Sequence, residues 1–304
     1  MFLSDSWLLH QLKVEFLMGK GNVLSDKVGD IMTKGVVTCK PSDSLSEVRR
    51  LLVDHQISRV VVVDKENRPV GIITQKDLVR FLSSDKSMRG IDEIEASEVM
   101  SGNLVTTKPD TLVKDVAKTM IEKKISSIVI VDGEGKLRGI VTKADLEAWY
   151  AYEAKGAYIV FDFMTKKPIT IRPSYSIFIA ISLMSEHKIS RLVVVDNENK
   201  PIGVITLTDA TMLSDLLKPV RVVGDGKPIL VKGLLARPKS VHLLTVGDAM
   251  TASPLTIHED EDLAVAARLM ARHRISGLPV VNDAGRLTGI ITKSDITRAV
   301  ASRK

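Results

Sequence analysis

A block of about 46 residues occurs four times in this chain with the same internal spacing. Each copy is anchored on a methionine that follows an acidic residue by two positions; the four methionines are Met32, Met100, Met164 and Met250. A threonine follows at plus 6, an Ile-Ser pair at plus 25 and 26, a glycine at plus 39, a threonine at plus 42 and an aspartate at plus 45. No copy gains or loses a residue between its methionine and its aspartate. The chain is therefore a repeat protein in which one supersecondary unit is built four times.

The hydrophobic periodicity inside each copy predicts the element order β-α-β-β-α. A short strand at 36–38 precedes a helix whose apolar residues, such as Leu45, Val48 and Leu52, fall on one stripe. The β-branched run at 60–63 is apolar throughout and too short for a helix, which favours a buried strand. A third strand follows a turn, and a second helix begins at Thr-x-x-Asp. The sheet of one copy needs a partner to cover its open face. We therefore predict an α/β fold of four α+β units, paired through their sheets into two tandem modules.

The connections between copies indicate which copies pair. From each aspartate to the next methionine the chain runs 23, 19 and then 41 residues. Position plus 27 alternates as Arg59, Ser127, Arg191 and Gly277, so copies one and three resemble each other there. Both observations favour the pairs 1–2 and 3–4. The predicted boundaries are an N-terminal extension 1–22, repeats at 23–84, 92–152 and 157–215, a basic insertion 216–242, and the fourth repeat 243–304.

The third connection holds about 20 extra residues with a distinct composition. The β-rich runs 220–223 and 229–231 flank Gly224-Asp225-Gly226, a combination that predicts a hairpin. Residues 211–246 carry six basic and two acidic side chains, which is +4 of the formal net charge of +6. We expect a surface hairpin and tail that contacts a partner or covers the sites of copies three and four. The alternative is a tolerated surface insertion.

Several features bear on location. The first 18 residues mix apolar and charged side chains without a basic n-region or a small-residue cleavage site, so they do not resemble a secretory signal. A docking helix and a non-native start are both open for them. The single Cys39 excludes an internal disulfide and fits a reducing compartment. The longest apolar runs are far shorter than a membrane span. These observations predict a cytoplasmic protein with no membrane partner.

The repeated motifs resemble the cystathionine β-synthase (CBS) domain. Copy four carries Gly247-Asp248-Ala249-Met250, then Ile275-Ser276-Gly277-Leu278-Pro279-Val280-Val281, then Gly289-Ile290-Ile291-Thr292-Lys293-Ser294-Asp295. The four matches span roughly 220 residues. The resemblance implies that two motifs pack into a module with two clefts, and that four motifs are arranged as in the γ subunit of AMP-activated protein kinase and archaeal tandem CBS proteins. It also implies a regulatory role and binding of AMP, ADP or ATP, less often S-adenosylmethionine.

The Thr-x-x-Asp motif has two interpretations. It is a helix capping-box pattern, with threonine at the N-cap and the acid at N3. Against capping alone, all four copies use aspartate instead of the longer glutamate, and each motif follows a glycine that lets another backbone approach. A helix N-terminus also suits a phosphate. By resemblance, the aspartates would hold ribose hydroxyls and the threonines would touch ribose or phosphate. The aspartates are Asp77, Asp145, Asp209 and Asp295, and the threonines are Thr74, Thr142, Thr206 and Thr292.

The other candidate site residues also follow from the resemblance. The Ile-Ser pair lies where the family places adenine, although a helix-to-strand corner alone would need similar residues. Arg59 and Arg191 occupy a position of phosphate contacts, and arginine suits a phosphate through its planar fork. Ser127 and Gly277 lack that charge, so copies two and four could hold adenosine-type ligands or none. The remaining candidates are Ile57, Ser58, Ser126, Ile189, Ser190 and Ser276, with the plus-6 threonines Thr38, Thr106, Thr170 and Thr256.

No residue pattern predicts catalysis or a metal site. His55, His187 and His273 recur at plus 23 near a helix end, where the helix dipole favours histidine, so we interpret them as structural. The first hypothesis is an adenine-nucleotide sensor that regulates a protein partner or self-associates, for example as a homodimer. The second is a nucleic-acid-binding protein that uses the basic insertion, which lacks aromatic residues for base stacking. The third is a scaffold with vestigial ligand sites.

Overall fold

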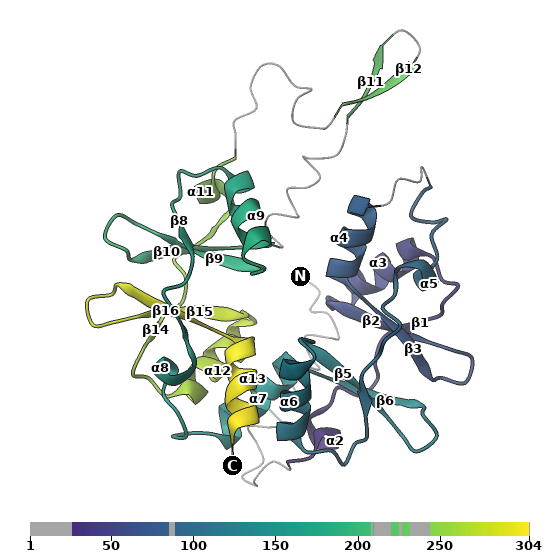
Figure 1. The fold of residues 1–304 in the computed structure, drawn as a ribbon, viewed down its shortest axis with the longest axis horizontal. Helices are drawn as coiled ribbons and strands as arrows, with labels where there is room; N and C mark the ends of the chain where they lie inside the picture. Colours follow the sequence, from purple (N-terminus) through teal and green to yellow (C-terminus); the bar gives the residue numbers. More distant parts are fainter. Residues whose placement is uncertain are drawn as a thin grey trace. The chain divides into compact units, whose positions relative to one another are not determined.

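The computed structural model describes residues 26–84, 89–207, 209, 220–224, 227–231 and 244–303 (Figure 1). The contacts divide the chain into two units. Unit 1 comprises Met1–Tyr158, Leu263–Arg274 and Lys293–Lys304, and unit 2 comprises Ile159–Asp262 and Ile275–Thr292. The predicted extension 1–22 and the side chains of the insertion lie outside the described residues.

Unit 1 contains copies one and two and the two long helices of copy four. Copy one forms α2 (Val28–Ile31), β1 (Thr38–Cys39), α3 (Leu45–Asp54), β2 (Arg59–Val63), β3 (Pro69–Thr74) and α4 (Gln75–Ser84). Copy two forms α5 (Ala96–Val99), β4 (Thr106–Thr107), α6 (Val113–Glu122), β5 (Ser127–Val131), β6 (Leu137–Thr142) and α7 (Lys143–Glu153). Copy four contributes α12 (Leu263–His273) and α13 (Lys293–Ser302). In each three-stranded sheet, β1-β2-β3 or β4-β5-β6, the first pairing is parallel and the second antiparallel.

Unit 2 contains copy three together with the first short helix and the strands of copy four. Copy three forms α8 (Val160–Phe163), β7 (Thr165–Lys166), β8 (Thr170–Ile171), α9 (Ile177–Glu186), β9 (Arg191–Val195) and β10 (Pro201–Thr206). Copy four adds α11 (Val246–Ala249), β13 (Thr251–Ala252), β14 (Ile257–His258), β15 (Gly277–Val281) and β16 (Leu287–Thr292). The sheet orders are β13-β10-β9-β8 and β14-β15-β16-β7, so each sheet takes one strand from the other copy. The predicted α/β fold, with units paired through their sheets, is confirmed.

Each copy contains one short helix that the predicted element order did not include. A one-turn helix (α2, α5, α8 or α11) directly precedes each repeat methionine. In three copies this helix is capped by the acidic residue that lies two positions before the methionine. The N-cap amides of Glu95, Ile159 and Thr245 donate to the side chains of Glu98, Asp162 and Asp248 at 3.0, 3.1 and 2.9 Å. The acidic position of the repeat therefore stabilises a helix start.

The one-turn helix of each copy forms backbone hydrogen bonds with the other copy of its pair, so the two copies exchange these helices. In unit 1 the amide of Val28 donates to the carbonyl of Thr111 at 2.9 Å, and in the reverse direction the amide of Ala96 donates to the carbonyl of Asp43 at 2.8 Å. Copies three and four are joined in the same way, with Val160 donating to Glu261 at 2.8 Å and Val246 donating to Tyr175 at 2.7 Å. The predicted pairs 1–2 and 3–4 are confirmed.

The glycine at plus 39 receives the methionine of the paired copy. A Cβ added at Gly139 would lie 2.6 Å from Sδ of Met32 and 2.9 Å from the carbonyl oxygen of Thr33. The same contact joins Gly71 with Met100, Gly203 with Met250, and Gly289 with Met164. The prediction of a close approach is confirmed, but the nearest group is a side chain instead of a backbone. Met and Gly at fixed positions therefore form one interlock between two copies.

The central strands β2 and β9 are buried on both faces. In β2, Val60 and Val62 pack with Leu45, Val48 and Leu52 of α3 in the core of copy one. The alternate residues Val61 and Val63 pack with Val129 and Ile140 of copy two. Val193 and Val195 meet Leu287 and Ile290 likewise in unit 2. The opposite faces of one strand thus serve the core of a copy and the interface with its partner, as the continuous apolar run predicted.

Helix α7 is the centre of the helical part of unit 1. It packs against α12 and α13, and α13 also packs against α6, so the four helices lie side by side (Figure 1). Its residues from Asp145 to Ala151 are all buried. Arg268 of α12 donates to the carbonyl of Ala151 at 2.8 Å. A helix covered on all sides explains why the sequence of α7 lacks a clear polar face.

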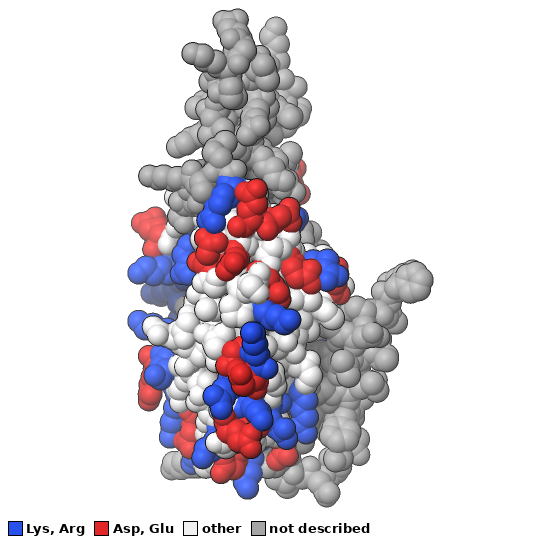
Figure 2. Space-filling view, turned by 90° about the vertical axis from the view of Figure 1, so that its right-hand side faces the viewer, with Lys and Arg blue, Asp and Glu red and all other residues white. Residues whose placement is uncertain are grey.

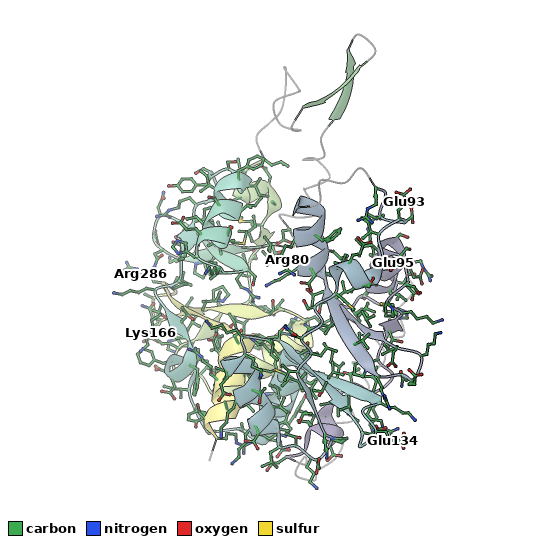
Figure 3. All side chains as sticks on the ribbon, turned by 45° about the vertical axis from the view of Figure 1, so that its right-hand side comes forward. Arg80, Glu93, Glu95, Glu134, Lys166 and Arg286 are labelled. Carbon is green, nitrogen blue, oxygen red and sulfur yellow. The ribbon has the colours of Figure 1, made fainter. Side chains whose placement is uncertain are left out.

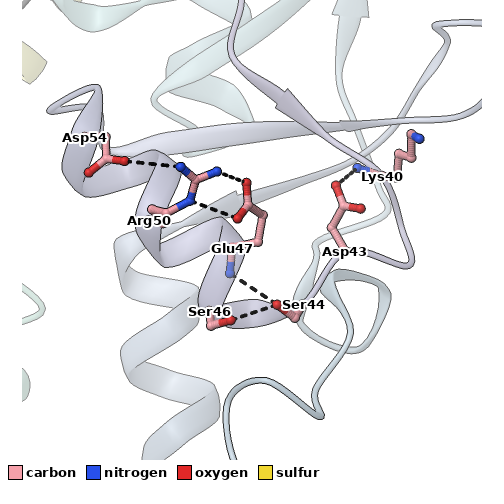
Figure 4. A network of polar contacts seen from close by, with 7 residues as sticks. All are labelled: Lys40, Asp43, Ser44, Ser46, Glu47, Arg50 and Asp54. Atoms are coloured by element: carbon pink, nitrogen blue, oxygen red, sulfur yellow. Dashed lines mark hydrogen bonds and ion pairs between the residues drawn. The ribbon is translucent and has the colours of Figure 1, made fainter.

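The exposed face of α3 carries a helix cap and ion pairs. Ser44 caps it by accepting from the amide of Glu47 at 3.3 Å. Nε of Arg50 donates to Glu47 at 2.9 Å, and Asp54 lies 3.7 Å from the same guanidinium (Figure 4). The face in Figure 2 likewise shows basic and acidic side chains interspersed. Such exposed pairs contribute little individually.

Three further predictions can be compared with the structure. The strands β11 (Val220–Gly224) and β12 (Lys227–Val231) pair antiparallel, so the predicted hairpin is confirmed. Cys39 is a free cysteine in β1 with 4% exposure, and burial raises the pKa of its thiol to about 12. It packs as a small apolar residue in the core of copy one. No helix among the described residues is long and apolar enough to cross a membrane.

We predict that Gly139→Ala lowers the free energy of unfolding by about 1–3 kcal/mol, because the new methyl group meets Met32 and the carbonyl of Thr33. The matched control is Gly133→Ala, where no atom lies within 4 Å of an added Cβ. Chemical denaturation of both variants measures the difference. Equal stability of the two variants would contradict the interlock.

Candidate functional site

The Thr-x-x-Asp motifs form capping boxes in the first three copies. Oδ2 of Asp77 accepts from the amide of Thr74 at 2.9 Å and from its hydroxyl at 2.6 Å. The corresponding distances are 2.8 and 2.8 Å between Thr142 and Asp145, and 2.8 and 2.8 Å between Thr206 and Asp209. Aspartate is therefore long enough to reach the N-cap residue here. The expectation that its short side chain argues against capping is wrong.

Capping uses only one oxygen of each carboxylate, and in three copies side-chain donors approach the other. Oδ1 of Asp77 accepts from Arg80 at 2.8 Å, and the Asp77 side chain is 12% exposed. Figure 3 shows Arg80 extending from α4. Oδ1 of Asp145 accepts from the hydroxyl of Thr33 at 3.3 Å, and Oδ1 of Asp295 from Arg298 at 2.5 Å. Since Oδ1 accepts side-chain donors here, a ligand hydroxyl could take such a place.

Thr33 is a contact that the sequence analysis missed. It belongs to copy one, directly follows Met32, and reaches the aspartate of copy two. A signal for it exists in the sequence, because a hydroxyl residue follows every repeat methionine: Thr33, Ser101, Thr165 and Thr251. The exchange of the one-turn helices places Thr33 beside the partner's motif. A candidate site at Asp145 is therefore made by both copies of its pair.

The Ile-Ser pair adjoins the start of the second helix. Gln56 ends α3 in the left-handed conformation with φ of 51°, and the amide of Ile57 then donates to the carbonyl of Leu52 at 3.0 Å. This is a Schellman helix end. The serine carbonyl of the pair then accepts the first amide of the second helix, at 3.2 Å between Gln75 and Ser58. The same bond joins Lys143 to Ser126 at 3.2 Å and Leu207 to Ser190 at 2.9 Å. The pair and the Thr-x-x-Asp motif are thus brought together in copies one to three.

The two arginines at plus 27 point across their pairs. Nη1 of Arg59 donates to the hydroxyl of Ser126 in copy two at 3.4 Å, and Nε and Nη2 donate to Ser58 at 3.3 and 3.2 Å. Burial lowers the pKa of Arg59, and the nearby carboxylate of Asp145 opposes that shift. A Cβ at Gly277 would collide with Nη1 of Arg191. In pair 3–4 the glycine at plus 27 therefore leaves room for the arginine of the paired copy.

The remaining candidates occupy less connected positions. Thr38, Thr106 and Thr170 lie in the first strands, and Thr256 directly precedes β14. Within the described residues, no hydrogen bond links their hydroxyls to the motif aspartates. Ile189 packs against the core of copy three. In copy four, Ser276 and Thr292 belong to unit 2, whereas Asp295, 4% exposed, belongs to unit 1.

Two other features lie apart from these residues. His55 and His187 are the C-cap residues of α3 and α9, and His273 ends α12, so all three occupy the predicted helix ends. A cavity of about 580 Å³ lies elsewhere in unit 1, lined by residues that include Lys27, Lys34 and Arg138 and none of the candidates. Among the described residues, no group of three or more His, Cys, Asp and Glu side chains could hold a metal ion.

The repeat spacing, the exchanged one-turn helices and the paired sheets define a class of tandem motif. The CBS domain family model matches residues 28–84, 96–151, 160–214 and 246–302. The chain therefore belongs to the CBS domain family, and it carries four copies of the motif. The wider repeat boundaries predicted above stay a prediction.

Relatives are found among archaeal proteins. The uncharacterized protein MJ1404 of Methanocaldococcus jannaschii is 31% identical over 290 residues, which are 93% of this chain and 63% of that protein. MK0525 of Methanopyrus kandleri is 37% identical over 123 residues, 40% of this chain and 61% of that protein. The chain spans less than two thirds of the length of either relative.

A solved structure shares the four-motif fold. Protein MJ1225 of Methanocaldococcus jannaschii, described as a proposed archaeal homologue of g-AMPK, superposes with a TM-score of 0.70. The sequence identity is 23%, and the match covers 90% of this chain and 99% of that one. At this identity the likeness concerns the fold.

We predict that Asp77→Ala lowers the free energy of unfolding by about 1 kcal/mol, because the amide and hydroxyl of Thr74 lose their acceptor. The control is Asp115→Ala in the first turn of α6, whose N-cap has no side-chain hydrogen bond. Thermal and chemical denaturation of the ligand-free proteins measure both changes. If Asp77→Ala is as stable as the wild type, the cap contributes nothing and only a ligand role explains the motif.

Proposed function

We propose that this protein binds adenine nucleotides between its paired CBS motifs and acts as a regulatory protein that senses energy or metabolite levels. One observation carries the proposal. In pair 1–2 the half-buried guanidinium of Arg59 approaches Ser126 beside the carboxylate of Asp145. An arginine fork suits a phosphate, and a carboxylate can accept from the two vicinal hydroxyls of a ribose. A phosphate partner and a ribose partner thus occur together.

The proposed ligands are AMP, ADP or ATP, with S-adenosylmethionine a weaker candidate because it offers no phosphate to Arg59. The proposed contacts are the candidates named from the sequence, and Thr33 joins them. In pair 3–4 the equivalent arginine, Arg191, lies against Gly277, and Asp209 of the same copy caps its helix as Asp77 does in copy one. Membership of the family supports binding in general, and the choice among these ligands rests on Arg59 and the aspartates.

We assign the protein a binding role without catalysis, since the motifs supply hydrogen-bonding groups at helix starts and the sequence places no nucleophile beside a base. We expect a protein partner or a second copy to respond to ligand occupancy. A cytoplasmic location fits the single cysteine, which is free. The side chains of the basic insertion lie outside the described residues, so no contact in the structure favours the nucleic-acid hypothesis.

We expect isothermal calorimetry to detect binding of AMP, ADP or ATP by the full chain. Specific binding also raises stability by mass action, by about 2.7 kcal/mol at a ligand concentration 100-fold above Kd. A thermal shift with each nucleotide therefore checks the calorimetry. If all three nucleotides and S-adenosylmethionine give neither heat nor a shift at millimolar concentration, the proposed function is wrong.

We predict that replacing both Arg59 and Arg191 with alanine weakens AMP binding roughly tenfold or more and leaves adenosine binding nearly unchanged, because only the phosphate partner is removed. Arg50→Ala is the control, since its exposed guanidinium pairs with Glu47 on α3. Competition calorimetry with AMP and adenosine measures the ratio. Equal losses for the two ligands would assign the arginines a structural role.

A further inference from the structure

The cavity of about 580 Å³ in unit 1 lies between copies one and two, away from the Ile-Ser and Thr-x-x-Asp residues. Copy one contributes α2 and the residues around Met32 to its lining. Copy two contributes the loop after β4 and the start of β6, which lies beside α2 (Figure 1). Asp145 follows the opposite end of β6. The volume lies within the range of about 300–1,000 Å³ that is typical of small-molecule sites.

Backbone hydrogen bonds between the copies hold the walls of this cavity in place. The amide of Gly29 donates to the carbonyl of Pro109 at 2.8 Å. The amide of Leu137 donates to the carbonyl of Asn67 at 2.9 Å, so the start of β6 is tied to copy one. Pro109 and Leu137, together with Met32, give the cavity an apolar wall. The cavity is therefore preformed, as small-molecule sites usually are.

Charged side chains of both signs line the cavity without pairing with one another. Lys34 and Arg138 are cations, and Asp30 and Asp110 are anions. Within the part of the chain that the structure describes, none of these four side chains forms an ion pair or a hydrogen bond. A third cation, Lys27, also lines the cavity. The opposite charges are thus too far apart to pair directly, and their hydrogen-bonding groups can serve another molecule.

Asp30 differs from the acidic residues at the same position of the other three copies. Glu98, Asp162 and Asp248 cap their one-turn helices by accepting from the N-cap amides. In α2, whose N-cap residue is Lys27, no side-chain cap bond is formed by the residues described. The carboxylate of Asp30 is therefore not used by its own helix, and it is exposed in the cavity.

Pair 3–4 differs at the same positions. The place of Gly29 is taken by Phe161, and Lys166, the counterpart of Lys34, stacks on that ring with its ammonium 3.5 Å from the ring centre. Among the four copies, only copy two has a basic residue at plus 38, which is Arg138. The charged cavity is therefore a feature of pair 1–2 and not a general consequence of the repeat.

We infer that this cavity binds a small zwitterionic metabolite, an α-amino acid with an apolar side chain. Arg138 and Lys34 pair with the carboxylate of the ligand, for which a planar guanidinium fork is well suited. Asp30 and Asp110 accept from its ammonium group, and its side chain lies against the apolar wall. A ligand with both charges satisfies the cations and the carboxylates together, whereas an anion or an amine alone leaves one set unpaired. This site is separate from the proposed nucleotide site and does not depend on it.

The test measures the binding of L-leucine to the full chain by calorimetry. The comparison ligands are isocaproate, which lacks the amino group, and isoamylamine, which lacks the carboxylate. We expect L-leucine to bind roughly tenfold or more tightly than either analogue, because each analogue loses one charge-assisted contact. If either analogue binds as tightly as L-leucine, or if neither L-leucine nor L-methionine binds at millimolar concentration, the inference is overturned.

Variants that remove one charge assign the two ends of the ligand. Arg138→Gln should weaken the binding of L-leucine and isocaproate roughly tenfold, and Asp30→Asn should weaken that of L-leucine but not that of isocaproate. The control is Lys136→Gln, an exposed lysine outside the cavity that pairs with Glu134 at 2.7 Å, and it should bind as the wild type does. Saturating ATP should leave the binding of L-leucine unchanged. Displacement by ATP, or unchanged affinity in both cavity variants, would contradict the assignment.

Discussion

The interlock of a methionine with the glycine of a paired copy holds this architecture together. Because a side chain and a carbonyl oxygen occupy the place of a Cβ at Gly139, the strand of one copy and the entering segment of the other are in close contact. The exchanged amide bonds on either side fix the direction of that segment. Interiors are packed too densely to absorb an extra methyl group cheaply. Two copies can therefore approach in one register only, and the apolar faces of their sheets meet in that register.

The candidate site is a product of this pairing. Thr33 enters the partner with its one-turn helix and contacts Asp145, and Arg59 crosses in the same direction to Ser126. Neither contact exists within a single copy. Only the first copy of each pair carries an arginine at plus 27, Arg59 or Arg191. A pair of similar copies thereby acquires two chemically different sides, which gives the protein a means of distinguishing the ligands it holds.

Most of the fold could be predicted from the sequence because the repeat multiplies weak signals. An apolar β-branched run or an amphipathic stripe is ambiguous once, but four aligned occurrences fix the element order. The one-turn helices escaped prediction because four residues carry too little periodicity. The reach of Asp77 to its N-cap also depends on local geometry that spacing alone does not give. Contacts between copies two and four, such as that of Lys143 with Ser294, require the packing of helices far apart in the chain.

The exchange of one-turn helices also limits how such a chain can change in length. The first turn of each copy packs against its paired copy, and the paired copy does the same in return, so the loss of one copy leaves its partner incomplete. In solenoid repeats, by contrast, each repeat contacts only its neighbours in the stack, and single repeats can be added or removed. In this chain the smallest unit that can be gained or lost as a whole is a pair of motifs. Chains of this type should therefore gain or lose motifs two at a time, and an odd motif would survive only by pairing with another molecule.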